Sequence, residues 1–129
     1  MHKAVATVHC GWRGHVCNIY EKVIAAMIKA YGSNPADLHV GISPSLSPQH
    51  AEFINYRKEF PESFWQFRVK EHHFDLWALA IWQLNQANIL SKHIQIAEMC
   101  TYANNVDCFS YRRGQRTTGA HGTVAVLCA

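Results

Sequence analysis

Apolar residues recur at spacings of three and four along residues 15–31, which is the periodicity of one face of an α-helix. This stretch predicts an amphipathic helix that ends at Gly32, because glycine readily takes the left-handed backbone that closes many helices. A second helix is predicted over residues 76–88, with Asp75 as its N-cap. Its apolar residues occupy more than one face, so we expect it to be buried between layers or at an interface.

Short apolar runs rich in β-branched residues predict strands. The first covers residues 3–9 (K-A-V-A-T-V-H) and has the composition of a strand buried on both faces. Further strands are predicted at residues 37–42, 67–69, 94–99, 108–111 and 123–127, with a proline-containing loop at 43–48 and a helical turn at 56–60. The alternation of strands with two long helices predicts the α/β (α+β) class, with a mixed β-sheet layered with two main helices in one domain spanning residues 1–129.

Composition narrows the class of protein without naming a function. No run of about 18 apolar residues predicts a membrane span, and the residues after Met1 leave no room for a signal peptide. The five cysteines are odd in number and form no C-x-x-C pair, so we expect reduced thiols in a cytoplasmic protein. A formal charge of +3 is too small to imply a nucleic-acid partner.

Five sequence blocks together carry a specific resemblance. They are, in order, A-T-V-H-C-G-W-R-G at 6–14, I-S-P-S-L-S-P at 42–48 with Glu52, Asp75-Leu76, Cys100-Thr101, and F-S-Y-R-R at 109–113 with Thr118-Gly119. This series resembles the YfiH/YlmD family, also called multicopper polyphenol oxidase or laccase-domain proteins. The resemblance implies zinc-dependent purine nucleoside phosphorylase activity with adenosine deaminase activity; one branch is called a peptidoglycan editing factor. It also implies half of a four-layer α/β/β/α fold that the family shares with a group of bacterial toxin domains.

The chain departs from the family pattern at several positions. Ser43 and Ser47 replace two glycines, which puts the usual backbone of that loop in question. Gln49 and His50 stand where many members have a cysteine or a pair of them. Family members are also much longer, so the resemblance covers only the C-terminal half of such a domain.

The resemblance implies a zinc cofactor with two of its three ligands absent from this chain. The family zinc is held by a His, a Cys and a His, and only the last has a counterpart, His9; the others would lie upstream of Met1. A catalytic zinc keeps one position open for water and lowers the pKa of that water to about 7, which gives a nucleophile for the C6 position of adenosine. The alternative for His9 is a core histidine bonded to a backbone carbonyl.

Two further residues are candidates for contacts with a purine nucleoside and phosphate. Arg13 is predicted as a catalytic and substrate-binding residue, because its planar guanidinium binds oxyanions bidentately; a structural pair with a carboxylate is the alternative. Ser45 is predicted as a substrate-binding residue of the loop near the pocket. Trp12 could stack a purine, although a tryptophan in such a turn is more often core, and Cys10 is expected to pack as a small apolar group.

The remaining clusters favour structural roles. Arg112, Arg113 and Arg116 form a basic cluster without an aromatic array, so we expect them to hold loops or a carboxylate and not nucleic acid. His72 and His73 are expected in a solvated turn. Histidine, cysteine and methionine do not cluster as a copper site requires.

These observations leave two hypotheses. The first is a member of the zinc-dependent phosphorylase/deaminase family whose site is incomplete in this chain. The second is a non-catalytic remnant or interaction module that retains the fold. Half of a layered fold exposes a sheet edge and an apolar face, so we expect a homo-oligomer or pairing with a missing N-terminal half.

Overall fold

The computed structural model describes residues 3–115 and 119–128, which form two compact units. Unit 1 contains the chain up to Val40, residues 80–94 and the chain from Thr123 onward, and unit 2 contains residues 41–79 and 95–122. The chain changes unit within strand β1 (Val40–Ile42), helix α4 (Leu76–Gln86) and strand β4 (Ile94–Ile96). Each unit is therefore assembled from segments that are distant in the sequence.

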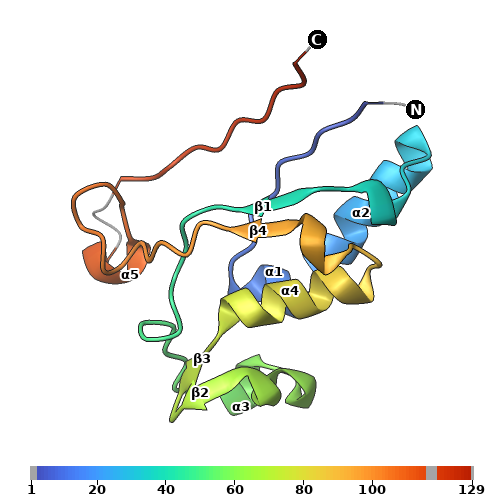
Figure 1. The fold of residues 1–129 in the computed structure, drawn as a ribbon. Helices are drawn as coiled ribbons and strands as arrows, with labels where there is room; N and C mark the ends of the chain where they lie inside the picture. Colours follow the sequence, from blue (N-terminus) through green and yellow to red (C-terminus); the bar gives the residue numbers. More distant parts are fainter. Residues whose placement is uncertain (1–2, 116–118, 129) are drawn as a thin grey trace. The chain divides into compact units, whose positions relative to one another are not determined.

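Unit 1 begins with two helices where the sequence predicts one. Helix α1 (Trp12–Val16) and helix α2 (Ile19–Tyr31) are separated at Asn18, whose φ is 47° (Figure 1). Asparagine tolerates this left-handed backbone better than most residues, which allows the break. Helix α2 ends at Gly32, which has a φ of 63°, so the predicted helix end is confirmed.

The C-terminal part of α4 is held to α1 by a reciprocal pair of hydrogen bonds within unit 1. Nδ1 of His15 lies 2.8 Å from Oε1 of Gln83, and Nε2 of Gln83 donates to the carbonyl oxygen of His15 at 2.8 Å. Both residues are buried, with 4% and 3% of their surface exposed. Both polar groups of Gln83 are thus satisfied, as burial requires.

Residues 3–11 of unit 1, and residues 119–128, which pass from unit 2 into unit 1 at Thr123, are extended but are not strands. Residues 3–11 and 119–128 are drawn as tubes in Figure 1, and most of their valines are exposed, among them Val5 (46%), Val8 (43%), Val124 (86%) and Val126 (77%). The predicted strands at 3–9, buried on both faces, and at 123–127 are therefore wrong for the described chain. A strand requires a neighbouring backbone for its N–H and C=O groups, and the described residues provide no strand partner for either segment.

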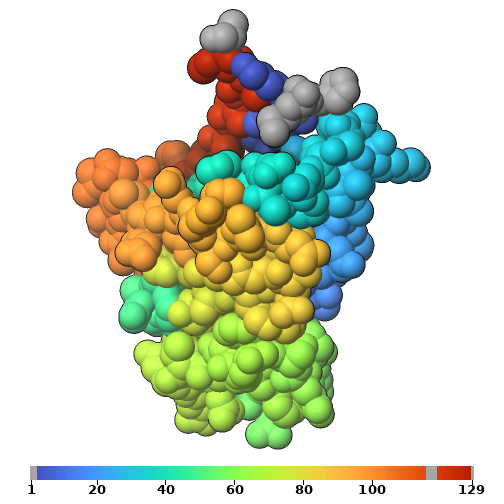
Figure 2. Space-filling view, turned by 45° about the vertical axis from the view of Figure 1, so that its right-hand side comes forward, coloured from blue at the N-terminus to red at the C-terminus, as the bar shows by residue number. Residues whose placement is uncertain are grey.

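Unit 2 has a core of aromatic rings contributed by one stretch of chain. Helix α3 (Tyr56–Glu59), the 3-10 helix η2 (Glu62–Phe67) and the antiparallel pair β2 (Arg68–Lys70) and β3 (His73–Phe74) follow one another, and Figure 2 shows this yellow-green stretch massed together. Ring centroids in the core are 4.7 to 6.2 Å apart, a range in which tilted and edge-on ring pairs are favourable. The buried rings are those of Phe53, Tyr56, Phe60, Phe64 and Phe74.

Local capping explains where other elements of unit 2 begin. Oδ1 of Asp75 accepts from the N–H of Ala78 at 2.9 Å, so the predicted N-cap of α4 is confirmed. The predicted strand at 108–111 is wrong, because the side chain of Ser110 accepts from the N–H of Arg113 and caps helix α5 (Tyr111–Gly114) instead.

Two short sheets and two further 3-10 turns complete the described elements. Strands β1 and β4 form one two-stranded sheet, β2 and β3 the other, and the turns are η1 (Pro35–Asp37) and η3 (Ser91–His93). The mixed α/β class is confirmed. Among the described residues, no helix is both long enough and apolar enough to cross a bilayer.

Replacing Gln83 by leucine should destabilise the protein by about 2–4 kcal/mol, because Nδ1 and the carbonyl of His15 would stay buried without partners. Gln86→Leu is the matched control, since Gln86 is exposed on the same helix and its substitution should change stability by less than about 0.5 kcal/mol. Urea denaturation followed by circular dichroism measures both. A single unfolding transition in the wild type is expected if residues 1–129 are one domain. An equal decrease in unfolding free energy in the two variants would contradict the role of the His15–Gln83 hydrogen bonds.

The stability contributed by His15 should decline in acid. Burial lowers the pKa of His15 below its ordinary value, and the hydrogen bond with Gln83 only partly offsets this. Below about pH 6.5 the unfolded chain therefore binds more protons at this position than the folded one, and stability is lost as the pH falls toward the folded pKa. The difference in unfolding free energy between wild type and His15→Gln should narrow from about pH 7.5 to about pH 5. A constant difference would contradict this account.

Candidate functional site

His9 lies on the exposed coil that precedes α1. A methyl group added at Gly11 would lie 3.4 Å from Nε2 of His9, so the imidazole is close to the turn that follows it. The exposure of His9 contradicts the alternative of a core histidine. An accessible imidazole with little packing around it is available as a metal ligand.

The described residues do not by themselves fit a zinc ion. Among residues 3–115 and 119–128, no group of three His, Cys, Asp or Glu side chains is arranged to hold a metal. A catalytic zinc needs about three protein ligands. His9 offers one imidazole.

Arg13 is exposed in the first turn of α1, and Trp12 beside it is half-buried. The guanidinium carbon of Arg13 lies 4.4 Å from the centroid of the Trp12 ring, which is a cation–π contact. Stacking of this kind orients the guanidinium without using its N–H groups. His9 and Arg13 belong to the same unit and flank Gly11.

Cys10 lies between these two residues and packs as predicted. A methyl group added at Gly14 would lie 3.1 Å from Sγ of Cys10, so the thiol fills the space above that glycine. Burial raises the pKa of Cys10, the hydrogen bond with Tyr20 lowers it, and Cys17 raises it; the net direction is upward. Burial, followed by the contact with Cys10, also raises the pKa of Tyr20. Both groups stay neutral, which suits a packing role for Cys10.

Ser45 belongs to unit 2, and its polar groups bind other parts of that unit. Its Oγ accepts from Nε1 of Trp77 at 2.7 Å, its N–H donates to the carbonyl of Met99 at 3.0 Å, and its carbonyl accepts from the N–H of Thr101 at 3.0 Å. These bonds fix the loop that carries Ser45. A role of its hydroxyl in substrate binding stays a prediction.

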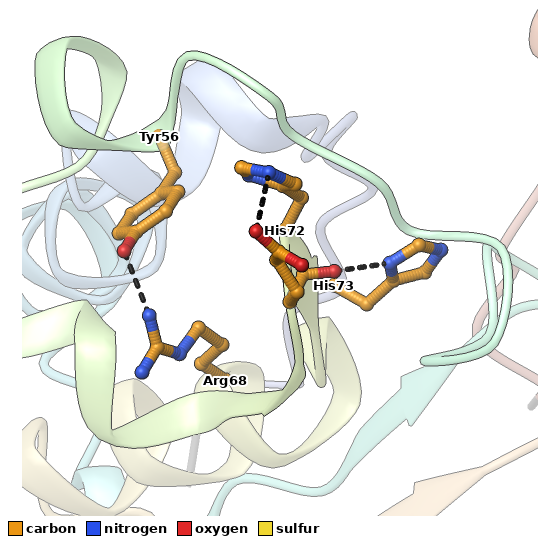
Figure 3. Close-up of polar contacts among 5 residues, drawn as sticks. Tyr56, Arg68, His72 and His73 are labelled. Carbon is orange, nitrogen blue, oxygen red and sulfur yellow. Dashed lines mark hydrogen bonds and ion pairs between the residues drawn. The ribbon is translucent and has the colours of Figure 1, made fainter.

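A surface hollow of about 300 Å³ in unit 2 was not predicted from the sequence. Figure 3 shows Tyr56 and Arg68, where Nη1 of Arg68 donates to the Tyr56 hydroxyl at 2.7 Å, and His72, whose Nε2 lies 3.4 Å from Oε1 of Glu71. Three cationic side chains and one acidic side chain line the hollow, which makes it net positive; these are Arg57, Lys58, Arg68 and Glu71. The lining residues come from two segments, 54–58 and 68–72. In the sequence, only the adjacent cations Arg57 and Lys58 pointed to this hollow. His9, Arg13 and Ser45 do not line it.

His72 lies in the turn between β2 and β3, but His73 is the first residue of β3 and both are half-buried, so the predicted solvated turn is wrong for His73 and only partly right for His72. His72 has a left-handed φ of 59°, and Nδ1 of His73 lies 2.8 Å from the carbonyl oxygen of Glu71 (Figure 3). These contacts are local to the hairpin. They give no indication of a metal-binding pair.

The arginines after Ser110 hold loops together, as predicted. Arg113 donates to the carbonyls of Thr101, Tyr102 and Cys108 at 2.8, 2.7 and 2.6 Å. Arg112 donates to the carbonyl of Glu52 at 2.6 Å. Arg116 and Thr118, the other residues predicted from this region, lie outside the described residues.

Comparison with known proteins places the chain in a family. The family described as multi-copper polyphenol oxidoreductase laccase matches residues 1–128. A purine nucleoside phosphorylase of Bacteroides thetaiotaomicron is 31% identical over 121 residues, which are 87% of this chain and 45% of that protein. The purine nucleoside phosphorylase YfiH of Escherichia coli is 30% identical over 123 residues, which are 89% of this chain and 47% of the relative.

Solved structures give the same result for the fold. YlmD from Geobacillus stearothermophilus matches with a TM-score of 0.74 at 28% identity, over 87% of this chain and 45% of that one. A YfiH protein from Bacillus licheniformis matches with a TM-score of 0.73 at 25% identity, over 86% and 45%. The mixed helix-and-sheet fold is thus that of about half of such a structure, and the chain spans about half the length of its curated relatives. Because the family matches nearly every residue, this chain belongs to the multi-copper polyphenol oxidoreductase laccase family, in which the YfiH and YlmD proteins are its relatives.

Proposed function

We propose that this chain contributes part of a zinc-dependent purine nucleoside phosphorylase site, which also deaminates adenosine. The observation that supports this is the family match over residues 1–128, together with relatives named purine nucleoside phosphorylase. The chain spans about half of those relatives, so the activity of a whole protein is itself part of the proposal.

His9 is proposed as one zinc ligand and Arg13 as a contact for phosphate or the ribose. The exposure of both side chains supports these roles, since each is accessible to a partner. The stacked guanidinium of Arg13 can present two N–H groups to an oxyanion. Ser45 is proposed as a further substrate contact from its loop.

The remaining zinc ligands are proposed to come from another polypeptide segment, either an N-terminal half or a second copy of this chain. His9 supplies one ligand, and among the described residues no group of three could hold a metal. A catalytic zinc takes about three protein ligands, which supports a second source for the others. A cytoplasmic setting is proposed because all five cysteines are free thiols, as is usual in a reducing compartment.

Inosine turnover with and without phosphate tests this function directly. If a second copy completes the site, the purified chain should release hypoxanthine from inosine only with phosphate. If an N-terminal half completes it, this turnover should appear only when that half is added. In either case adenosine should also give inosine. His9→Ala should reduce this turnover by about a hundredfold or more, since loss of even an outer-shell partner of a metal ligand costs 10–100-fold. His39→Ala is the matched control, because His39 is another exposed histidine of unit 1 and should leave turnover unchanged. Equal turnover in the His9 variant and wild type would refute the role of His9, and no turnover in the wild type either alone or with the N-terminal half would favour a non-catalytic module.

A non-catalytic interaction module is the second candidate, and one observation favours it. The extended terminal segments of unit 1 expose Val5, Val8, Val124, Val126 and Leu127 to solvent. Such apolar, unpaired segments are suited to adding a strand to another sheet. The proposed partner is again a second copy or an N-terminal half.

Sedimentation velocity should show concentration-dependent association of the wild-type chain. The double variant Val124→Lys and Val126→Lys should sediment as a monomer, because charges on both exposed positions oppose strand addition. Val106→Lys is the control, since Val106 is 87% exposed but belongs to unit 2. A wild type that is monomeric at every concentration would argue against self-association through these segments.

A further inference from the structure

Two polar residues of unit 2, Ser47 and His50, lie beside the sulfur of Cys100. The N–H of Ser47 donates to Sγ of Cys100 at 3.4 Å. Nδ1 of His50 lies 3.5 Å from the same sulfur and 3.2 Å from Oγ of Ser47, within hydrogen-bond reach of both. The sulfur therefore accepts the N–H of Ser47 and lies beside a ring nitrogen of His50, which donates or accepts according to its tautomer; both residues belong to the loop that follows β1.

The geometry of this cluster is fixed from both sides. Ser45 and Cys100 form a parallel β-bridge, which holds the two loops in register. The His50 ring stacks on Tyr102, with centroids 4.6 Å apart and planes 25° from parallel. Ser47 is 5% exposed, and its carbonyl accepts from the N–H groups of His50 and Ala51. The imidazole and the hydroxyl are thus held next to the thiol.

The donors favour the ionised form of the thiol. Partial burial by itself raises the pKa of Cys100. Hydrogen bonds from the Ser47 side chain and from the backbone at Ser47, Ala103 and Tyr102 lower this pKa by more than burial raises it, so the net direction is downward. Hydrogen bonds to a charged form stabilise that form. Cys100 is also only half-buried, so a small molecule can approach its sulfur.

Charged side chains also contact the segment that follows Cys100. Besides His50 and Tyr102, the guanidinium of Arg113 on α5 donates to the carbonyls of Thr101 and Tyr102. The carboxylate of Asp107, in the turn after Cys100, accepts from the side chain of Asn104 at 3.1 Å. A positive group thus adjoins the segment that carries the thiol, and the nearby negative group has its own donor.

The other cysteines differ from Cys100 in ways that make them internal references. Cys108 is buried, and burial raises the pKa of Cys10. Cys17 is exposed, but its Sγ donates to the carbonyl of Gly14 at 3.4 Å, whereas the sulfur of Cys100 accepts. Exposure alone would make Cys17 and Cys128 react first, so a greater reactivity of Cys100 must come from its donors.

We propose that Cys100 is a nucleophilic thiolate that exchanges with low-molecular-weight disulfides, with Ser47 and His50 as its positioning residues. An electron pair of the Cys100 sulfur attacks one sulfur of a disulfide R–S–S–R, and a new S–S bond to the protein forms. The original S–S bond breaks, and its electron pair leaves with the second sulfur as a thiolate, which takes a proton from water. The product is a mixed disulfide at Cys100. The exchange uses neither His9 nor Arg13, so it does not rest on the proposed phosphorylase activity.

Timed reaction of the reduced, folded chain with glutathione disulfide tests the proposal. Peptide mass spectrometry reports modification at each cysteine in the same sample. Cys100 should be modified first, about three- to tenfold faster than Cys17 or Cys128 near neutral pH, because the thiolate is the reacting species. The pH at which its rate is half-maximal should lie below that of Cys17. Faster reaction at Cys17 or Cys128, or the same pH midpoint at Cys100 and Cys17, would overturn the proposal.

Two variants identify the source of the reactivity. Ser47→Gly and His50→Gln should each slow modification of Cys100 and move its pH midpoint upward, while modification of Cys17 should not change. Gln49→Ala is the matched control, because Gln49 is an exposed neighbour on the same loop. An unchanged midpoint in both variants would refute positioning by these residues, and the wild-type comparison of Cys100 with Cys17 decides the reactivity even if a variant does not fold.

Discussion

The two hydrogen bonds between Gln83 and His15 hold the first helix of unit 1 in place, and the candidate residues around Gly11 depend on that helix. Arg13 is in helix α1 and His9 is on the coil that enters it. A buried amide that satisfies both a ring nitrogen and a carbonyl admits one orientation of the helix, because another orientation leaves polar groups without partners. The direction in which His9 and Arg13 project is thus decided by a side chain that touches neither.

Features with local causes were predictable from the sequence. The end of α2 at Gly32 and the start of α4 at Asp75 depend on residues within a few positions, and both agree with prediction. The break at Asn18 and the cap at Ser110 are also local, but the apolar periodicity of residues 15–31 and the strand-like apolar and aromatic residues around Ser110 hid them. Whether residues 3–9 and 123–127 form strands could not be predicted from nearby residues, because a strand depends on a partner elsewhere in space. For the candidate site, the resemblance identified the family and the positions, but not the stacking of Arg13 on Trp12, the bond from Trp77 to Ser45 or the cationic hollow.

The cysteines show how one residue type acquires different chemistry from its surroundings. The thiol of Cys10 lies against Gly14 and Tyr20, where burial dominates and the neutral form is favoured. The thiol of Cys100 receives hydrogen bonds, and the ionised form is favoured. Neither result follows from the spacing of cysteines along the chain, which contains no recognised pair. The replacement of a glycine by Ser47 adds a hydroxyl beside the sulfur, and a departure from a family pattern can therefore carry as much chemical information as a match.

The division of the chain also bears on the order in which the protein folds. The aromatic core of unit 2 is made within one short stretch, from Phe53 to Phe74, and contacts of that kind form early because little chain entropy is lost in closing them. Unit 1 requires residues before Val40 to meet residues after Ala80, across a separation of 68 positions between His15 and Gln83. On the ribosome, α1 must therefore wait without its buried partner until Gln83 has emerged, so the segment with His9 and Arg13 becomes ordered only after the residues of the aromatic core have been made.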